Sequence, residues 1–200
     1  MSAHGHLWSA PQCQPAARRT EPGASDAPAT DCHMRLKCAT RPEHGRVDQL
    51  ISQFDLARPE TYAAFLSINA AALMALRPHW RCVDEADFGT LAAALIADLA
   101  AIGVDPPTDA QPAPGSIDGL GLAYVVRGSR LGSAILRKRV AAGFPTAYFD
   151  VRPALSWQTL LQQVNKRGAA GTGYEQAIIG GARATFAVYE RLACREGQTA

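Results

Sequence analysis

The chain has 200 residues, 48% of them hydrophobic, and a formal net charge of +2. A chain of this length and apolar content is expected to form one domain with a substantial hydrophobic core. The small net charge argues against nucleic acid as a partner. No apolar run approaches the roughly 18 residues that a membrane-spanning helix needs, so we expect no membrane association. The five cysteines are scattered without a CxxC pair, which favours reduced thiols in a cytoplasmic protein over a disulfide framework or a structural zinc site.

The first part of the chain differs in composition from the rest. Residues 1–33 are rich in Pro, Ala, Ser, Gly, Gln and Thr, have no hydrophobic period and lack the continuous apolar core of a signal peptide. We therefore expect a disordered N-terminal extension over residues 1–33. A helical domain over residues 34–195 and a disordered C-terminal tail over residues 196–200 follow.

Helical patterns dominate after this extension. Apolar or small residues recur near a 3.6-residue period over residues 40–54, and residues 35–39 form a lead-in turn, which places Pro42 near the helix start, where proline is tolerated. Caps, prolines and periodicity predict the later helices over residues 59–76, from Asp84 or Asp87 to about 99, from Ser116 or Asp118 to about 142, over 157–167 with Ser156 as the cap, and over 174–193. No segment reads as a strand, because residues 148–151 are too few. The fold class is therefore an all-α single domain of about six helices.

The helix predicted from residue 120 contains two glycines four residues apart, Gly128 and Gly132, with Ser129 and Ser133 at the same spacing. Glycine inside a helix costs roughly 1 kcal/mol relative to alanine. Positions i and i+4 lie on one face, so one face of this helix carries little side-chain volume. Either another helix or a flat ligand can lie against its backbone.

His44 is the histidine that the helical pattern places inside a helix, one turn before Asp48. Such an imidazole is a hydrogen-bonded core residue, a surface residue or an axial ligand of haem iron. Lys37 and Arg41 share roughly its face on a helical reading, with Lys37 about 10 Å along the axis. That separation suits a haem whose carboxylates point back to the lysine, but spacing alone favours an ordinary solvated lysine.

Two strings occur in order along the chain: KCATRPEHGRVD at residues 37–48 and LGLAYVVRGSRLG at residues 120–132. They resemble the proximal and distal helices of the haem oxygenase family. The GSRLG form is similar to the bacterial branch that often accompanies bacteriophytochromes. The resemblance covers about residues 35–192 and implies a haem oxygenase-like helical bundle.

The same resemblance implies roles for individual residues. His44 matches the proximal ligand of the haem iron. Lys37 and Tyr124 match a basic residue and a tyrosine near the haem propionates. Gly128 and Gly132 match the distal glycines whose backbone lies over the haem, where backbone approaches more closely than ordinary side chains.

Further candidates match less directly. Lys166 and Arg167 are the nearest candidates for the family's basic residues in the last two helices. Ser129 stands where animal-type members carry an aspartate that orders the distal water. Ser129 and Ser133 adjoin the glycine face and are candidates to bind water near the iron, although helix-interior serines more often bond back to the preceding turn. Arg130, about 200° around the helix from Gly128, should point away to a surface or interhelical salt bridge.

The implied activity is that of a haem oxygenase, for which haem is both substrate and cofactor. Haem, O₂ and reducing equivalents would give biliverdin, CO and ferrous iron. A neutral histidine suits this reaction because a thiolate ligand favours O–O cleavage. The sequence has no glycine motif for flavin or nicotinamide, so the external electron donor would be a ferredoxin or flavin reductase, and a bacteriophytochrome is a candidate acceptor of the biliverdin.

Two other interpretations fit the same residues. In one, the chain is a non-catalytic haem-binding or haem-sensing protein of the same fold. This interpretation is based on Ser129, which replaces the aspartate of animal-type members. In the other, Gly128 and Gly132 let two helices pack closely, His44 is a core or surface residue, and the domain is an interaction module.

Overall fold

The computed structural model of the chain describes residues 31–82, 85–108 and 110–197. Within these ranges the regular elements are all helices, arranged as one compact unit, which confirms the predicted all-α single domain. None of the helices in these ranges is long and apolar enough to cross a membrane. The segments expected to be disordered, residues 1–33 and 196–200, lie mostly outside the described residues. Where they are described, helix extends to Cys32 at one end and to Gly197 at the other.

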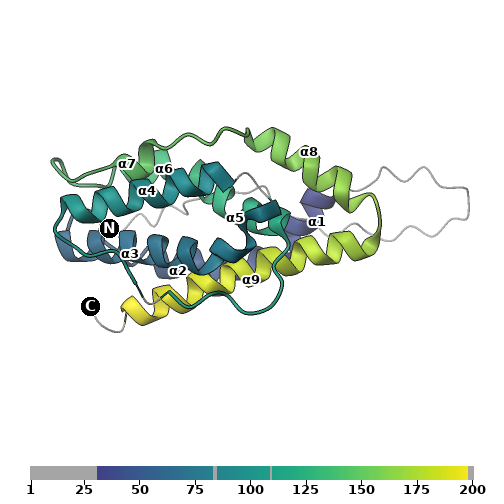
Figure 1. Cartoon of the computed structure of the whole chain (residues 1–200), viewed down its shortest axis with the longest axis horizontal. Helices are drawn as coiled ribbons and strands as arrows, with labels where there is room; N and C mark the ends of the chain where they lie inside the picture. The colour runs from purple at the N-terminus through teal and green to yellow at the C-terminus, as the bar shows by residue number, and fades with distance from the viewer. Residues whose placement is uncertain (1–30, 83–84, 109, 198–200) are drawn as a thin grey trace, which may run out of the picture.

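The elements form an elongated bundle (Figure 1). In chain order they are α1 (Cys32–Ala39), α2 (Arg41–Ile51), α3 (Pro59–Leu76), the 3₁₀ helix η1 (Arg77–Cys82), α4 (Glu85–Ala101), α5 (Gly119–Leu131), α6 (Ser133–Arg137), α7 (Ala147–Asp150), α8 (Trp157–Gly168) and α9 (Thr172–Gly197). The short helices α6 and α7 lie toward one end, whereas α1 and α8 lie at the other. The long α9 packs against α1, α2, α3, α5 and α8 and joins the two ends.

Local signals place several helix starts where the sequence predicts them. The Asp118 side chain accepts hydrogen bonds from Leu120 N at 2.9 Å and Gly121 N at 3.2 Å, so it caps α5. Ser156 Oγ accepts from Thr159 N at 3.1 Å and caps α8. Asp87, expected as a possible start of α4, lies inside that helix instead, and Asp84 lies outside the described residues.

The segment predicted as a lead-in turn followed by one helix is in fact two helices, α1 and α2, separated at Thr40. Thr40 has φ −105° and ψ 3°, and its amide still donates to the Leu36 carbonyl at 3.0 Å. Pro42 cannot continue this ladder because it has no N–H. The helix therefore breaks just before His44.

The glycine-bearing helix is shorter than predicted, because α5 ends at Leu131 and Gly132 separates it from α6. Residues 147–150, for which no element was expected, form the short helix α7. The Asp98 carboxylate caps the start of that helix, because its two oxygens accept hydrogen bonds from Ala147 N at 2.9 Å and Tyr148 N at 2.8 Å.

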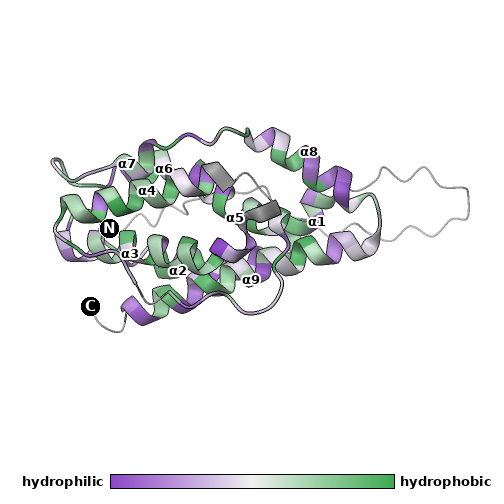
Figure 2. Ribbon diagram, viewed as in Figure 1, coloured by the Kyte–Doolittle hydropathy of each residue, from purple (hydrophilic) through white to green (hydrophobic). Residues whose placement is uncertain are grey.

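Two clusters of buried side chains hold the bundle together. The larger lies mainly between α3, α4, α5 and α9, and apolar residues dominate α3 and α4 in Figure 2. The smaller lies where α1, α5, α8 and α9 meet; it comprises Cys32, Leu36, Val125, Val164, Ile178, Ala182 and Phe186.

Helix α5 approaches α9 closely through Gly121 and Gly181. A Cβ on Gly121 would overlap the Ile178 carbonyl oxygen and lie 2.6 Å from Ala182 N, and a Cβ on Gly181 would lie 2.7 Å from Asp118 O. Only glycine permits this contact between backbones. The small residues that helix packing requires are therefore at 121 and 181.

Charged pairs align α1 and α2 along α9. Arg35 pairs with Glu175, Glu43 with Arg183 and Arg46 with Glu190, at 2.5, 3.4 and 2.9 Å. The residue numbers rise together on both sides, so these helices run parallel. The pairs bracket His44 and fix it over α9.

Candidate functional site

His44 lies on α2 with its side chain 35% exposed. Its Nδ1 is 3.1 Å from Asp48 Oδ2, and its ring meets the Phe186 ring edge-on, with the centroids 5.6 Å apart and the planes at 79°. A histidine that ligates a metal commonly donates its other ring nitrogen to a carboxylate. With Nδ1 turned to Asp48, Nε2 is the nitrogen suited to ligate iron.

A residue of α5 close to Gly128 belongs to the smaller buried cluster. Val125, one turn before the buried Gly128, packs in the smaller cluster with Phe186, the residue that His44 also contacts. Gly132 follows on the same face at i+7 from Val125. Phe186 of α9 thus contacts His44 of α2 and shares a buried cluster with Val125 of α5.

Gly132 is not required by helix packing. A Cβ built on it would have Ser129 O at 3.7 Å as its nearest neighbour, an ordinary van der Waals distance. This contrasts with Gly121, whose Cβ would collide with α9. The interpretation in which helix packing explains Gly132 therefore loses its support, and close packing explains Gly121 instead.

Helices α2 and α5 both pack on α9 but hardly touch each other. None of the residues of α2 is fully buried, although Val47, Leu50 and Ile51 pack partly against the core. The two elements that would hold a flat ligand are therefore joined mainly through α9.

The predicted basic residues are divided between two helix ends. Lys37 is half-buried on α1 and lies across the break at Thr40 from His44 on α2. Arg41 is exposed at the first position of α2, and Lys166 is exposed on α8. Arg167 lies 3.7 Å from Asp118 and 4.8 Å over the Tyr174 ring, so it contacts the start of α5.

Lys37 and Lys166 belong to the same end of the bundle, because α1 contacts α8 there. His33 N donates to Asn165 Oδ1 at 2.9 Å, one residue from Lys166. Figure 1 shows these two helices together at the right-hand end. Two of the predicted cations therefore belong to helices that meet at one end of the bundle.

Tyr124 packs on Trp157 of α8, with the ring centroids 5.3 Å apart. Burial raises the pKa of Tyr124 to about 12, so its phenol is a neutral hydrogen-bond donor at neutral pH. Ser129 is exposed and its Oγ donates to the Val126 carbonyl at 2.8 Å, the bond back to the preceding turn that helix-interior serines favour. Ser133 is buried at the first residue of α6.

Arg130 points away from the glycine face, as expected, but its partners differ. Its NH2 donates to the carbonyls of Tyr148 and Phe149 at 2.7 and 3.1 Å, and its guanidinium lies 4.4 Å from the Tyr148 ring centroid. The expected salt bridge is therefore wrong. The buried ion pair that α5 does form, between Arg127 and Asp87, was not predicted; the signal was a charged residue inside the apolar string VVRG.

The cysteines differ in part from the expectation of reduced thiols. Cys38 is disulfide-bonded, so that expectation is wrong at this residue. Cys32 and Cys194 are free, and burial, with Glu175 nearby, raises the pKa of the Cys32 thiol. Cys32 is therefore protonated at neutral pH and packs as a small apolar side chain.

The comparisons with known proteins give no family for this chain: no family model matches it, and no curated protein does.

Among the described residues no group of three or more His, Cys, Asp or Glu side chains is placed to hold a metal ion. A lone histidine with a carboxylate partner fits iron whose other ligands come from a macrocycle. His44 and Asp48 thus fit the donor set that haem requires from the protein.

Proposed function

We propose that this chain is a haem oxygenase that cleaves haem with O₂ and reducing equivalents to biliverdin, CO and ferrous iron. The observation that carries the proposal is the position of His44. It contacts Asp48 and Phe186, and Phe186 belongs to the same buried cluster as Val125, which precedes Gly128 by three residues on α5. Gly132 supports the proposal, because a Cβ there would make only an ordinary contact with Ser129 O at 3.7 Å and close helix packing does not account for that glycine.

In this proposal His44 ligates the iron through Nε2. The Asp48 carboxylate accepts a hydrogen bond from Nδ1–H, and this bond fixes the orientation of the ring and raises its basicity. The Gly128 and Gly132 backbone covers the opposite face of the substrate, where side chains would collide with it. When bound, haem supplies the iron at which O₂ is activated.

The propionates of haem require cations at the edge of the site. Lys37 and Lys166 lie at the same end of the bundle, and Arg41 is exposed beside the start of α2. Tyr124 adds a neutral phenol donor. Arg167 takes part only if it exchanges its contact with Asp118.

The reaction needs electrons from outside the chain. A ferredoxin or flavin reductase would supply them, in the cytoplasm, and a bacteriophytochrome would be one acceptor of the biliverdin. These partners rest on the resemblance of the two motifs. They are tested by replacing a chemical reductant with each donor in the same assay.

A non-catalytic haem-binding protein is the second candidate. It is favoured by Ser129, whose hydroxyl is engaged with the Val126 carbonyl and therefore does not replace the missing aspartate as a donor to water. In this alternative His44 and the glycine face still hold haem, but turnover does not occur.

Single-turnover reduction separates the two candidates. Hemin-loaded protein is mixed with ascorbate and O₂, with catalase present to remove free peroxide, and the spectrum and released CO are followed. An oxygenase loses its Soret band and forms one biliverdin isomer with one CO per haem. A persistent Soret band without released CO would contradict the oxygenase proposal and support the non-catalytic haem-binding alternative.

A further inference from the structure

The residues TRPE at 40–43 have the sequence signature of a capping box. In that motif the threonine side chain accepts a hydrogen bond from the backbone N–H three residues later, and the glutamate side chain accepts one from the backbone N–H of the threonine. Pro42 would lie in the first helical turn, where proline is tolerated. The sequence therefore provides α2 with a helix start of its own at Thr40.

The structure does not form this capping box. Thr40 continues α1 instead, because its N–H and its Oγ1 both donate to the Leu36 carbonyl, at 3.0 and 2.8 Å. Glu43 is directed to α9, where its Oε1 lies 3.4 Å from Arg183 Nε, and its Oε2 is buried without a hydrogen-bond partner. A buried carboxylate oxygen without a donor is costly. Both capping groups are therefore engaged elsewhere, and one of them is left partly unsatisfied.

Arg183 of α9 holds this arrangement in place. Its NH2 donates to the Ala39 carbonyl at 2.9 Å, and its Nε contacts Glu43 on the other side of the break at Thr40. The Arg183 side chain is 53% exposed, so salt screens its pair with Glu43. One exposed side chain therefore joins the end of α1 and the start of α2 to α9.

Helices α1 and α2 differ in how firmly the rest of the bundle holds them. Cys32 and Leu36 of α1 are buried, and Cys38 is disulfide-bonded. None of the residues of α2 is fully buried. A change at the junction would therefore move α2 and leave α1 in place.

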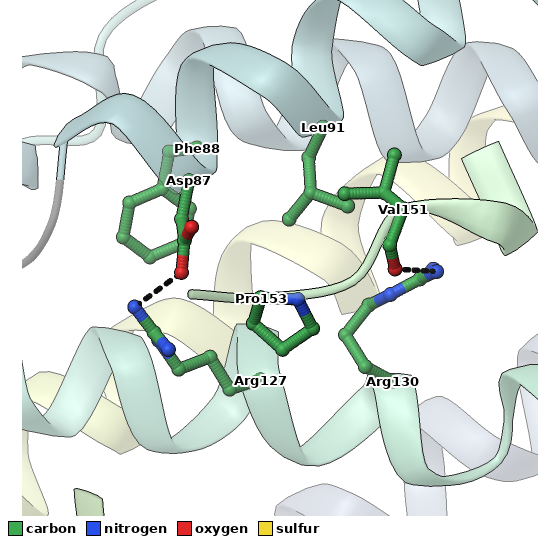
Figure 3. Close-up of a pocket in the computed structure, with 7 residues that line it drawn as sticks. All are labelled: Asp87, Phe88, Leu91, Arg127, Arg130, Val151 and Pro153. Carbon is green, nitrogen blue, oxygen red and sulfur yellow. Dashed lines mark hydrogen bonds and ion pairs between the residues drawn. The ribbon is translucent and has the colours of Figure 1, made fainter. Parts of the chain in front are cut away.

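Helix α5 is also held firmly. Figure 3 shows Asp87 of α4 paired with Arg127 of α5, at 2.6 Å and with the Arg127 side chain 4% exposed. In the same view Arg130 donates to the Val151 carbonyl, in the segment after α7, at 3.4 Å. Salt screens buried pairs much less than exposed ones. A motion of α2 would therefore leave α5 joined to α4.

We propose that the α1–α2 junction is a two-state hinge, in which Arg183 holds α2 closed on α9 and the capping box of Thr40 and Glu43 stabilises an open state. The φ of Thr40, −105°, already suits an N-cap residue in the β region, so the rotation occurs about ψ, which is 3° in the closed state. Opening would give the Glu43 carboxylate a backbone donor. It would also separate His44 from Phe186. The hinge does not depend on the binding of haem, because all its contacts lie within the chain.

Hydrogen exchange of the backbone amides in the full chain, without added hemin, tests the hinge. We expect the amides of residues 45–51 in α2 to exchange faster than those of residues 178–189 in α9, because α2 opens without global unfolding. Exchange in α2 should also rise with ionic strength. Equal protection of the two helices in the wild type, or exchange in α2 that salt does not change, would overturn the proposal, whichever variants fold.

Two substitutions distinguish the hinge from simple loosening of α2. Arg183→Gln removes the contacts that hold α2 closed and should raise exchange in α2 about 5-fold, as for the loss of one hydrogen bond. Adding Glu43→Ala removes the cap of the open state and should lower that exchange about 5-fold again. Exchange that rises or stays unchanged on adding Glu43→Ala would contradict the capped open state.

Each substitution has a matched control. Glu43→Gln, added to Arg183→Gln, should keep the raised exchange, because glutamine also forms the capping box. Arg35→Gln removes a pair that joins α1, rather than α2, to α9 and should leave exchange in α2 at the wild-type value. A rise in α2 as large as that of Arg183→Gln would contradict the role of Arg183.

Discussion

At the scale of single residues, the contact between His44 and Asp48 fixes the position of Nδ1 of the imidazole. The contact spans one helical turn, from Nδ1 to a carboxylate oxygen 3.1 Å away, and the Phe186 ring limits the other side. A histidine held in this way loses less rotamer freedom when it ligates a metal. The carboxylate also increases the basicity of the ring.

Asp48→Asn should therefore weaken hemin binding while leaving the fold intact. The amide accepts a weaker hydrogen bond than the carboxylate, and loss of such a partner costs about 10-fold or more in affinity. Hemin titration followed at the Soret band measures the change. An unchanged affinity, with Asp55→Asn as the matched control on an exposed loop, would show that Asp48 does not act on the histidine.

The pair between Arg35 and Glu175 gives the protein an acid-sensitive contact. The hydrogen bond from Arg35 holds the pKa of Glu175 below its usual value. A carboxyl with a lowered folded pKa contributes stability above its unfolded pKa, near 4.3, and this contribution is lost as the pH falls through the folded pKa.

We expect the Tm difference between the wild type and Glu175→Gln to be present at pH 7 and to shrink below about pH 4. Thermal unfolding of both proteins across this range measures it. A difference that stays constant down to pH 2 would mean that the charge of Glu175 is not the cause.

The buried pair between Arg127 and Asp87 predicts a larger effect. Asp87→Ala leaves the Arg127 guanidinium buried without a counter-charge and also removes the acceptor for Ala154 N. We expect a loss of about 3 to 5 kcal/mol in the free energy of unfolding, measured by urea denaturation. A loss under 1 kcal/mol would show that water reaches Arg127.

At the scale of elements, the glycines at the two ends of α5, Gly121 and Gly132, have different structural roles. Gly121 is required by the approach to α9, whereas Gly132 separates α5 from α6 and has little next to it. Sequence spacing draws attention to the pair at 128 and 132. The packing requirement at Gly121 is invisible locally, because the atoms that crowd it come from residues about sixty positions later.

Gly121→Ala should destabilise the protein by about 1 to 3 kcal/mol or more, because its Cβ meets backbone that cannot move aside easily. Gly132→Ala should change stability by under about 1 kcal/mol, since φ at 132 is −83° and suits any residue. Urea denaturation of the two variants provides the comparison. Equal losses would contradict the conclusion that close packing requires Gly121 but not Gly132.

At the scale of the whole molecule, local signals predicted most helices and missed the junctions. The range 59–76 and the caps at Asp118 and Ser156 were predicted because those signals act within a few residues. The short helix α7 depends on Asp98, about fifty residues earlier, and no local pattern reveals such a partner.

The candidate site was predictable to a similar extent. His44 and Asp48 share a helix, so their contact follows from spacing, and Ser129 bonds back to its own helix as serines tend to do. The break between two helices at Thr40, which separates Lys37 from His44, was not predicted from the sequence. The contact of Phe186 with His44 and the ion pair of Asp87 with Arg127 both form only through tertiary packing, which the sequence pattern does not encode.

The most direct test of the central claim is a hemin titration of the wild type beside His44→Ala and His79→Ala. His79 is the control because it lies on η1, where its Nε2 is 3.2 Å from the Ala113 carbonyl, away from α2. The proposal predicts one hemin per chain and a histidine-ligated Soret spectrum in the wild type and His79→Ala, and a shifted spectrum with weaker binding in His44→Ala. Absence of a Soret complex in the wild type, or an identical spectrum in His44→Ala, would contradict the haem site.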